Sequence, residues 1–454
     1  MAAPAEAGQA APAEAGQSAW TGTWATAQHA SYDPGTSEVT VRIPVRVSAG
    51  GSSARIRLAN GFTDQPVTIG HATVGPRGSG SAVRHPYDLR FDGKREVTIA
   101  AGEQAVSDPV RLAVPARTDL VVSLYFPGRL THISQHWMGL QTVYWTADGG
   151  GDHALDADGD AFTRTDSTFP FLTGVDVRGG DARGAVVALG DSITDGASST
   201  ANANRRWPDY LAARLSACSS TPGVLNEGIS GNRITAGTDG NPSALDRLER
   251  DVLSQPNART VILFEGVNDL SWGGATGGQV IDGMRQIARR AHARGLRVIG
   301  ATVVPYRGWG DWWTEAKEAD RQRVNAFVRD SGGVFDGYAD FDRAVRDPDD
   351  PTRYAAAFDS GDHLHPNDTG MKALADAVDL AALGVARDCP AARVRLTPYR
   401  PSLPAGQAAQ VTTTVTNTGP TSGSGDVGLV AGAVDLNDPG RTTAAVFDSF
   451  TVAE

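Results

Sequence analysis

Two kinds of hydrophobic pattern occur along the chain, and the first covers its N-terminal part. Residues 38–47 and 54–58 alternate polar with apolar side chains, which is the pattern of half-buried strands. Further β-rich stretches, separated at short intervals by Gly, Pro, Asn and Asp, lie at residues 66–74, 96–100, 110–114 and 119–126. We therefore expect residues 20–180 to form an antiparallel β-sandwich.

From residue 184 onward, short apolar runs alternate with longer stretches of helical spacing. Strands are predicted at residues 186–189, 223–225, 260–264 and 296–304 and near Val334. Helices are predicted around Trp207, Leu211 and Leu215 and at residues 243–253, 279–293, 315–329 and 369–383. Repeated β-α units with nearly continuous apolar strands imply a parallel sheet covered on both faces. Residues 184–390 are thus expected to be a three-layer α/β domain.

The two ends of the chain fit neither pattern. Residues 1–19 contain the sequence AAPAEAGQ twice in succession, too small and polar to build a core, and are predicted to be a flexible leader. Such a segment often remains after an export signal is cleaved, so we expect secretion, with an ordinary cytosolic tail as the alternative. Residues 391–454 return to alternation, with strand candidates at 410–416 and 445–452. They are predicted to be a β-rich tail or a partial module.

Composition and charge limit the kinds of molecule that the protein is expected to bind. The chain has 41 Lys and Arg against 52 Asp and Glu, a net charge of −11, and no helix or tail concentrates the basic residues. Nucleic-acid binding is therefore not expected. No apolar run approaches the ~20 residues that a membrane-spanning helix needs, so no transmembrane segment is expected. The expected oligomeric state is a monomer.

The two cysteines lie at the ends of predicted helices of the α/β domain. Cys218 follows its first helix and Cys389 follows its last, and such ends can be adjacent in a doubly wound domain. A disulfide between them is predicted, which an oxidising compartment would preserve, and two buried free thiols are the alternative.

Ligands of open parallel sheets bind beyond the carboxyl ends of the strands, so the residues that follow each strand are the candidates for a site. Ser192 comes at the turn after the first strand, where the following helix directs its N-terminal dipole at the side chain. Gly231 follows the second strand and lets its N–H approach a ligand closely. Asn268 follows the third and can donate to an oxyanion without adding charge. Taken singly, each is more often a helix cap or a turn residue.

A histidine motif precedes the last predicted helix. Asp362 and His365 are three residues apart, so the carboxylate can accept one imidazole N–H and leave the other ring nitrogen facing a serine. His363 has no acid at the matching offset, which favours His365 as the base. Two histidines beside an acid could instead bind a metal, but no third ligand and no H-E-x-x-H motif is present. No metal and no cofactor is expected.

These positions have complementary roles in one reaction. Ser192 would attack, His365 would take its proton and Asp362 would orient His365. The N–H groups of Ser192 and Gly231 and the amide of Asn268 would surround the developing oxyanion.

With these residues, the sequence resembles the SGNH or GDSL hydrolases, whose four signature blocks are named for a Ser, a Gly, an Asn and a His. The blocks match at Gly190-Asp191-Ser192, Gly231, Gly266-Val267-Asn268-Asp269 and Asp362-His363-Leu364-His365-Pro366, with Ile193 in place of the family's Leu. The resemblance covers the predicted α/β domain and implies a flavodoxin-like sheet and ester hydrolysis without a metal. Residues 20–24, together with residues 190–196 followed by 206–209, also resemble a secreted bacterial branch, in which a β-sandwich precedes the hydrolase domain and some members are called xylan-esterase-like.

The expected substrate is a carboxylic ester, with acetylated polysaccharide and acyl lipid as the two candidate classes. Trp309 and Trp312 lie in a Trp-rich stretch after the fourth strand, where indole rings would stack on sugars or cover acyl chains, or would clamp the next helix instead. Asp191 is also assigned to substrate binding.

Two alternatives to this family belong to other classes of protein. The α/β-hydrolases need a G-x-S-x-G elbow, which this chain lacks. A carbohydrate-binding protein with a vestigial hydrolase domain is the non-enzymatic alternative, and the complete set of five catalytic positions argues against it. The acid-rich residues 152–160 are similar to a calcium loop but lack EF-hand spacing, so a solvated turn is expected there.

Overall fold

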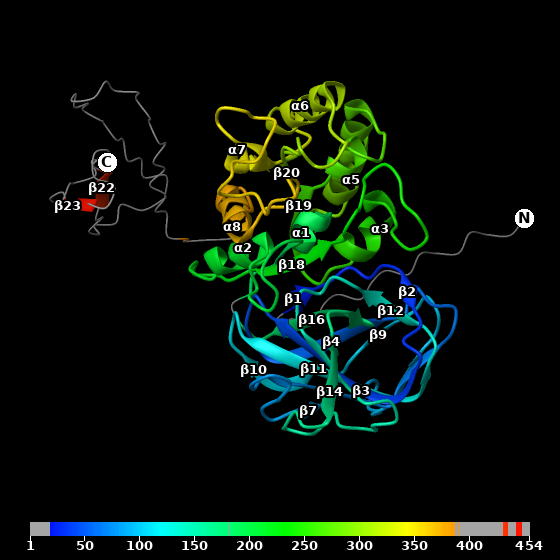
Figure 1. The fold of residues 1–454 in the computed structure, drawn as a ribbon. Coiled ribbons are helices and arrows are strands. Elements are labelled where there is room, and N and C mark those ends of the chain that lie inside the picture. The colour runs from blue at the N-terminus through cyan, green and yellow to red at the C-terminus, as the bar shows by residue number, and fades with distance from the viewer. Residues whose placement is uncertain (1–18, 181, 386–388, 390–429, 435–441, 447–454) are drawn as a thin grey trace, which may run out of the picture. The chain divides into compact units, whose positions relative to one another are not determined.

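The computed structural model describes residues 19–180, 182–385, 389, 430–434 and 442–446. The chain divides into two compact units, Met1–Arg387 and Asp388–Glu454. The first contains an antiparallel β region followed by an α/β domain (Figure 1). Residues 1–18 of the expected leader and the strand expected at 410–416 lie outside the described residues.

The antiparallel region is a β-sandwich, as predicted. Its strands are β1 (Thr21–Ala25), β2 (Ser31–Tyr32), β3 (Thr36–Arg46), β4 (Gly51–Ala59), β5 (Val67–Ile69), β6 (His71–Pro76), β7 (Tyr87–Asp88), β8 (Val97–Ile99), β9 (Gln104–Val106), β10 (Val110–Val114), β11 (Asp119–Leu130), β12 (Ile133–His136), β13 (Val143–Thr146), β14 (Phe162–Asp166), β15 (Phe169–Pro170) and β16 (Leu172–Arg178). One main sheet has the order β1-β16-β4-β10, with β9 also paired to β4, and the other has the order β14-β13-β3-β11-β6-β7.

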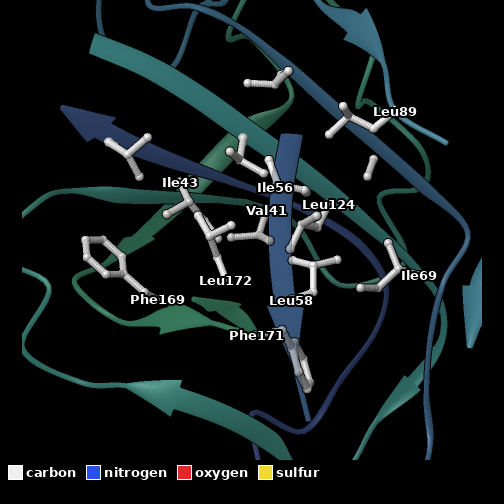
Figure 2. Close-up of a cluster of buried hydrophobic side chains, with 14 of the residues drawn as sticks. Val41, Ile43, Ile56, Leu58, Ile69, Leu89, Leu124, Phe169, Phe171 and Leu172 are labelled. Carbon is white, nitrogen blue, oxygen red and sulfur yellow. The ribbon is translucent and has the colours of Figure 1, made fainter. Parts of the chain in front are cut away.

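Alternation along the strands builds the core of the sandwich. Every second residue of β3 from Val39 to Val45 enters one hydrophobic cluster. Figure 2 shows Ile43 of this strand with Ile56 of β4 and Leu124 of β11 in the same cluster, so both main sheets contribute to it. The stretch predicted as a single strand at 66–74 is two strands, because β5 pairs with β8 whereas β6 pairs with β11.

The other face of β3 buries a charge. Arg42 is fully buried and donates from its guanidinium to the backbone carbonyls of Ser81 (2.8 Å), His153 (3.3 Å), Asp156 and Asp158. Residues 152–160 form a largely exposed turn, as predicted, and backbone carbonyls of this turn also bind the buried arginine. Carbonyl groups of this acid-rich loop converge on an arginine, which supplies the positive charge at their centre.

The α/β domain has a parallel sheet in the order β18-β17-β19-β20-β21. Its strands are β17 (Ala185–Gly190), β18 (Gly223–Gly228), β19 (Ala258–Phe264), β20 (Arg297–Ala301) and β21 (Gly337–Ala339). Its helices are α1 (Ser192–Asp195), α2 (Trp207–Leu215), α3 (Ala244–Leu248), the π-helical turn η1 (Glu249–Leu253), α4 (Val267–Leu270), α5 (Gly277–Ala293), α6 (Glu315–Arg329), α7 (Phe341–Val345) and α8 (Asp368–Ala377). The strand order is the flavodoxin-like 2-1-3-4-5, which the resemblance implied.

The helices form two groups on this sheet. Helix α8 contacts both α2 and α7, whereas α5 contacts both α3 and α6. The prediction of a three-layer domain is thus confirmed (Figure 1).

Two predicted elements of the α/β domain need correction. No strand lies at Val334, because Gly332 and Gly333 take positive φ angles of 63° and 88° and make a turn there, and the last strand, β21, follows at Gly337–Ala339. The last helix does not reach residue 383, since the backbone of Val378 is extended and ends α8 at Ala377.

Buried hydrogen bonds join the sandwich to the α/β domain. Ser48 accepts from the N–H of Val224 at 2.8 Å, at the start of β18. Arg57 of β4 donates to Gln255 at 2.7 Å, after η1. The two domains therefore pack as parts of one unit.

The second unit contains an antiparallel pair, β22 (Val430–Val434) and β23 (Thr442–Val446), which agrees with the predicted C-terminal β segment.

Cys218 and Cys389 are both disulfide-bonded, so the predicted bridge is present and neither thiol is free. Within the described ranges, no helix is long and apolar enough to cross a membrane.

Candidate active site

Ser192 is the first residue of the short helix that follows β17. Asp191 caps this helix, because its Oδ1 accepts from the N–H of Ile193 at 2.9 Å. As the first helical residue, Ser192 has no intrahelical acceptor for its own N–H. Its hydroxyl lies 2.8 Å from Nε2 of His365, although the two residues are 173 positions apart in the sequence.

The imidazole of His365 is fixed from its other side. Its Nδ1 donates to Oδ2 of Asp362 at 2.6 Å, and the N–H groups of Leu364 and His365 donate to Oδ1 of the same carboxylate at 2.9 and 2.8 Å. Partial burial would raise the pKa of Asp362, but these hydrogen bonds outweigh it and hold that pKa well below its usual range. Because Nδ1 keeps its proton and donates to the carboxylate, Nε2 is left as the acceptor for the hydroxyl of Ser192.

His363 forms a second pair of the same kind, which the sequence did not reveal. Its Nδ1 lies 2.6 Å from Oδ2 of Asp359, four residues earlier, so the expectation that it lacks an acid partner is wrong. The two histidines differ instead at the other ring nitrogen, because Nε2 of His365 is hydrogen-bonded to the hydroxyl of Ser192, whereas the hydrogen bonds of His363 go to Asp359.

Asn268 lies in α4, directly after β19, and is buried. Its Nδ2 donates to the backbone carbonyl of Asn232 at 3.0 Å and lies 3.4 Å from Oδ2 of Asp191. These partners are sequence neighbours of Gly231 and Ser192, so the amide contacts the two segments that contain the other predicted oxyanion donors. Gly231 itself has a φ of 73°, a conformation that favours glycine.

Close packing at Gly228 draws α1 against the end of β18. A Cβ at Gly228 would lie 2.2 Å from the backbone nitrogen of Asp195 and 2.6 Å from its Cα, so a larger residue would push the helix away. The helix that starts at Ser192 is thereby held beside the loop that contains Gly231.

A buried arginine on α3 joins the segments that hold these donors. Arg247 donates to the carbonyl of Gly190 (2.9 Å), the carbonyl of Glu227 (2.7 Å) and Oδ1 of Asn232 (2.9 Å), and lies 3.5 Å from the carboxyl of Glu265. Each contact is at the carboxyl end of a strand or in the loop after it. Arg247 therefore sets the spacing of the three strand ends that present the site. The sequence analysis missed it, because one arginine on a helix carries no distinguishing pattern.

Asp191 lies beneath the site and not at its surface. It is 1% exposed, and its hydrogen bonds go to Ile193 and Asn268. The assignment of Asp191 to substrate binding is therefore replaced by one in which it positions the nucleophile helix and the amide. Burial, together with the nearby carboxylates of Asp269 and Asp195, raises the pKa of Asp191 to about 7 despite the hydrogen bond from Ile193.

The sandwich also contacts the nucleophile helix. His136, the last residue of β12, is hydrogen-bonded through Nε2 to Oδ1 of Asp195 at 2.9 Å and through Nδ1 to the carbonyl of Ala27 at 2.8 Å. Burial alone would lower the pKa of His136, but the Asp195 carboxylate raises it above its ordinary value. The other oxygen of Asp195 accepts from Ser230 at 3.4 Å, next to Gly231. Sequence alone could not pair two residues so far apart.

Tryptophans lie close to the oxyanion donors and in the loop before α6. Trp309 and Trp312 have ring centroids 6.5 Å apart, and Trp312 is 46% exposed. Lys317 donates to the carbonyls of Trp312 (3.0 Å) and Ser271 (2.5 Å), which ties this loop to the segment after α4. Trp272, which the sequence analysis did not single out, contacts Asn268 directly.

Residues 188–373 match the family model described as GDSL-like Lipase/Acylhydrolase. This range contains the five predicted catalytic residues, Ser192, Gly231, Asn268, Asp362 and His365. This domain belongs to the GDSL-like lipase/acylhydrolase family. The GDSL-like domain makes the protein an ester hydrolase, as predicted. Among the described residues, no group of three or more His, Cys, Asp or Glu side chains is placed to hold a metal ion.

Solved structures similar to this chain include a GDSL-like lipase and a carbohydrate acetylesterase family member. One is a GDSL-like lipase from Bacteroides thetaiotaomicron VPI-5482, with 20% identity over 44% of this chain and 88% of that one and a TM-score of 0.34. Another is a carbohydrate acetylesterase family member from Sinorhizobium meliloti, with 18% identity over 44% of this chain and 99% of that one and a TM-score of 0.36. A search of curated proteins found no match.

Proposed function

We propose that this protein cleaves carboxylic esters through a covalent acyl-enzyme on Ser192. The observation that supports the proposal is the relay in which Ser192 Oγ lies 2.8 Å from His365 Nε2 and His365 Nδ1 lies 2.6 Å from Asp362. Nε2 takes the hydroxyl proton as Oγ bonds to the ester carbonyl carbon. The bond from that carbon to the alcohol oxygen then breaks, and His365 gives the proton to the departing alcohol.

Water completes the cycle by the same relay run in reverse. His365 takes a proton from water as the hydroxide adds to the acyl carbon, and the bond to Ser192 Oγ breaks with return of the proton to the serine. In both halves the carbonyl oxygen becomes negative. We assign the N–H groups of Ser192 and Gly231 and the Nδ2 of Asn268 to the stabilisation of that charge, because they donate hydrogen bonds without bringing charge of their own.

The substrate we propose is acetylated polysaccharide acted on outside the cell. Trp272 and Trp312 are 40% and 46% exposed, Trp272 is hydrogen-bonded to Asn268, and exposed indole faces suit the apolar faces of sugar rings. The disulfide of Cys218 and Cys389 supports an oxidising location, because reducing compartments rarely preserve such bonds. An acyl lipid is the competing substrate class.

Acyl-chain length separates these two substrate classes. We expect kcat/KM for a 4-nitrophenyl acetate to exceed that for the corresponding dodecanoate by at least about tenfold, since one poorly fitted methylene alone changes discrimination by about 10–200-fold. Acetate release from acetylated xylan, followed by chromatography, is the companion measurement. A steep preference for the dodecanoate, with activation at an oil surface, would replace the polysaccharide proposal by a lipase.

A further inference from the structure

We propose that Trp272 is a positioning residue that orients the amide of Asn268 toward the oxyanion. This inference rests on the proposed function, in which Asn268 is an oxyanion donor. The indole Nε1 of Trp272 donates to Oδ1 of Asn268 at 2.9 Å. The two residues are four positions apart, so the end of α4 places one above the other.

The hydrogen bond determines which end of the amide faces the site. Indole nitrogen is only a donor, so it pairs with the amide oxygen and not with the NH₂ group. On the other end of the amide, one N–H goes to the carbonyl of Asn232 at 3.0 Å. The longer 3.4 Å contact with Asp191 leaves the second N–H available to a stronger acceptor, which the oxyanion provides.

The indole ring is itself held in place from two directions. The guanidinium of Arg233 lies 4.6 Å from the ring centroid, a cation–π geometry. Toward the site, Cζ2 of the ring lies 3.8 Å from the position that a Cβ on Gly231 would occupy. Trp272 therefore lies beside the residue of one proposed oxyanion donor while its N–H bonds to the side chain of another.

The direct test is Trp272→Phe, which keeps an aromatic ring but removes the N–H. We expect kcat on 4-nitrophenyl acetate to fall about tenfold with KM within about twofold, because the lost hydrogen bond misaligns a donor whose contact strengthens in the transition state. The matched control is Trp137→Phe, the same change at an exposed tryptophan of the sandwich, which should leave both constants unchanged. Trp272→Leu, which also lacks a donor, should repeat the loss if the Phe variant folds poorly.

A double-mutant cycle shows whether Trp272 acts through Asn268. Asn268→Ala alone should lower kcat by about 10²–10³-fold, the usual effect of removing one oxyanion donor. In that background Trp272→Phe should have no further effect on kcat. A wild-type kcat for Trp272→Phe, or losses that multiply in the double variant, would overturn this inference while leaving the proposed function intact. Wild-type activity in Asn268→Ala would instead remove Asn268 from the oxyanion site and the inference with it.

Discussion

Replacement of Ser192 by alanine is expected to lower kcat on 4-nitrophenyl acetate by about 10⁶-fold, the scale found when the nucleophile of a serine hydrolase is removed. The expected loss is this large because the acyl-enzyme cannot form without Oγ, and the remaining donors act only on attack by water. Ser192 makes its side-chain hydrogen bond to His365 at 2.8 Å, on a helix capped independently by Asp191. The alanine variant should therefore fold.

The measurement is steady-state hydrolysis with purified protein, beside a thermal unfolding curve for each sample. An unchanged unfolding midpoint with activity near the uncatalysed rate is the expected pair of results. Ester hydrolysis at the wild-type rate by Ser192→Ala would show that another group carries out the reaction.

Removal of the imidazole of His365 is expected to be nearly as damaging. His365→Ala should lower kcat by at least about 10⁴-fold, because no other side chain in the described part of the chain is hydrogen-bonded to the hydroxyl of Ser192 to take its proton. The carboxylate of Asp362 would remain but would have no ring to orient.

The chain supplies a matched control in His363. Its pairing with Asp359 at 2.6 Å has the same length as that of His365 with Asp362, yet it has no contact with Ser192. His363→Ala should therefore keep most of the wild-type kcat. Comparable losses in the two variants would mean that the loop as a whole, and not the relay, sets the activity.

The architecture could be predicted largely because burial imposes simple periods. The alternation along β3 is the pattern of a strand with one face in the hydrophobic core, and the continuous apolar run of β17 is that of a strand buried on both faces. The helix predicted at 315–329 matches α6. Errors occurred where glycine or a cap overrode hydrophobicity. Gly332 and Gly333 shifted the last strand beyond Val334, and the extended backbone of Val378 ended α8 early.

Several site residues could be predicted from their positions along the chain, whereas contacts between residues far apart in the sequence could not be predicted. Ser192, Gly231 and Asn268 were predicted because each follows a strand of one parallel sheet, and His365 because an acid precedes it by three residues. Arg247 and His136 could not be found in this way, because each acts through a partner that only the folded chain brings near. Trp272 is only four residues from Asn268, which is a local signal. The hydrogen bond between them depends on the end of the short helix α4, which hydrophobic periodicity did not predict.

The non-enzymatic alternative, a carbohydrate-binding protein with an inactive hydrolase domain, differs from the proposed function in the reactivity of one hydroxyl. A serine activated by a histidine reacts with organophosphorus probes, whereas an ordinary serine on a binding protein does not. The same reaction therefore reports on the relay itself, without any assumption about the natural ester.

That reaction is labelling of the full chain with a fluorophosphonate, followed by intact mass and by peptide mapping. We expect one equivalent of label, located on Ser192, no label on the Ser192→Ala variant and greatly slowed labelling of His365→Ala. An unlabelled wild-type chain, or label on a different residue in a chain that still hydrolyses esters, would contradict the account.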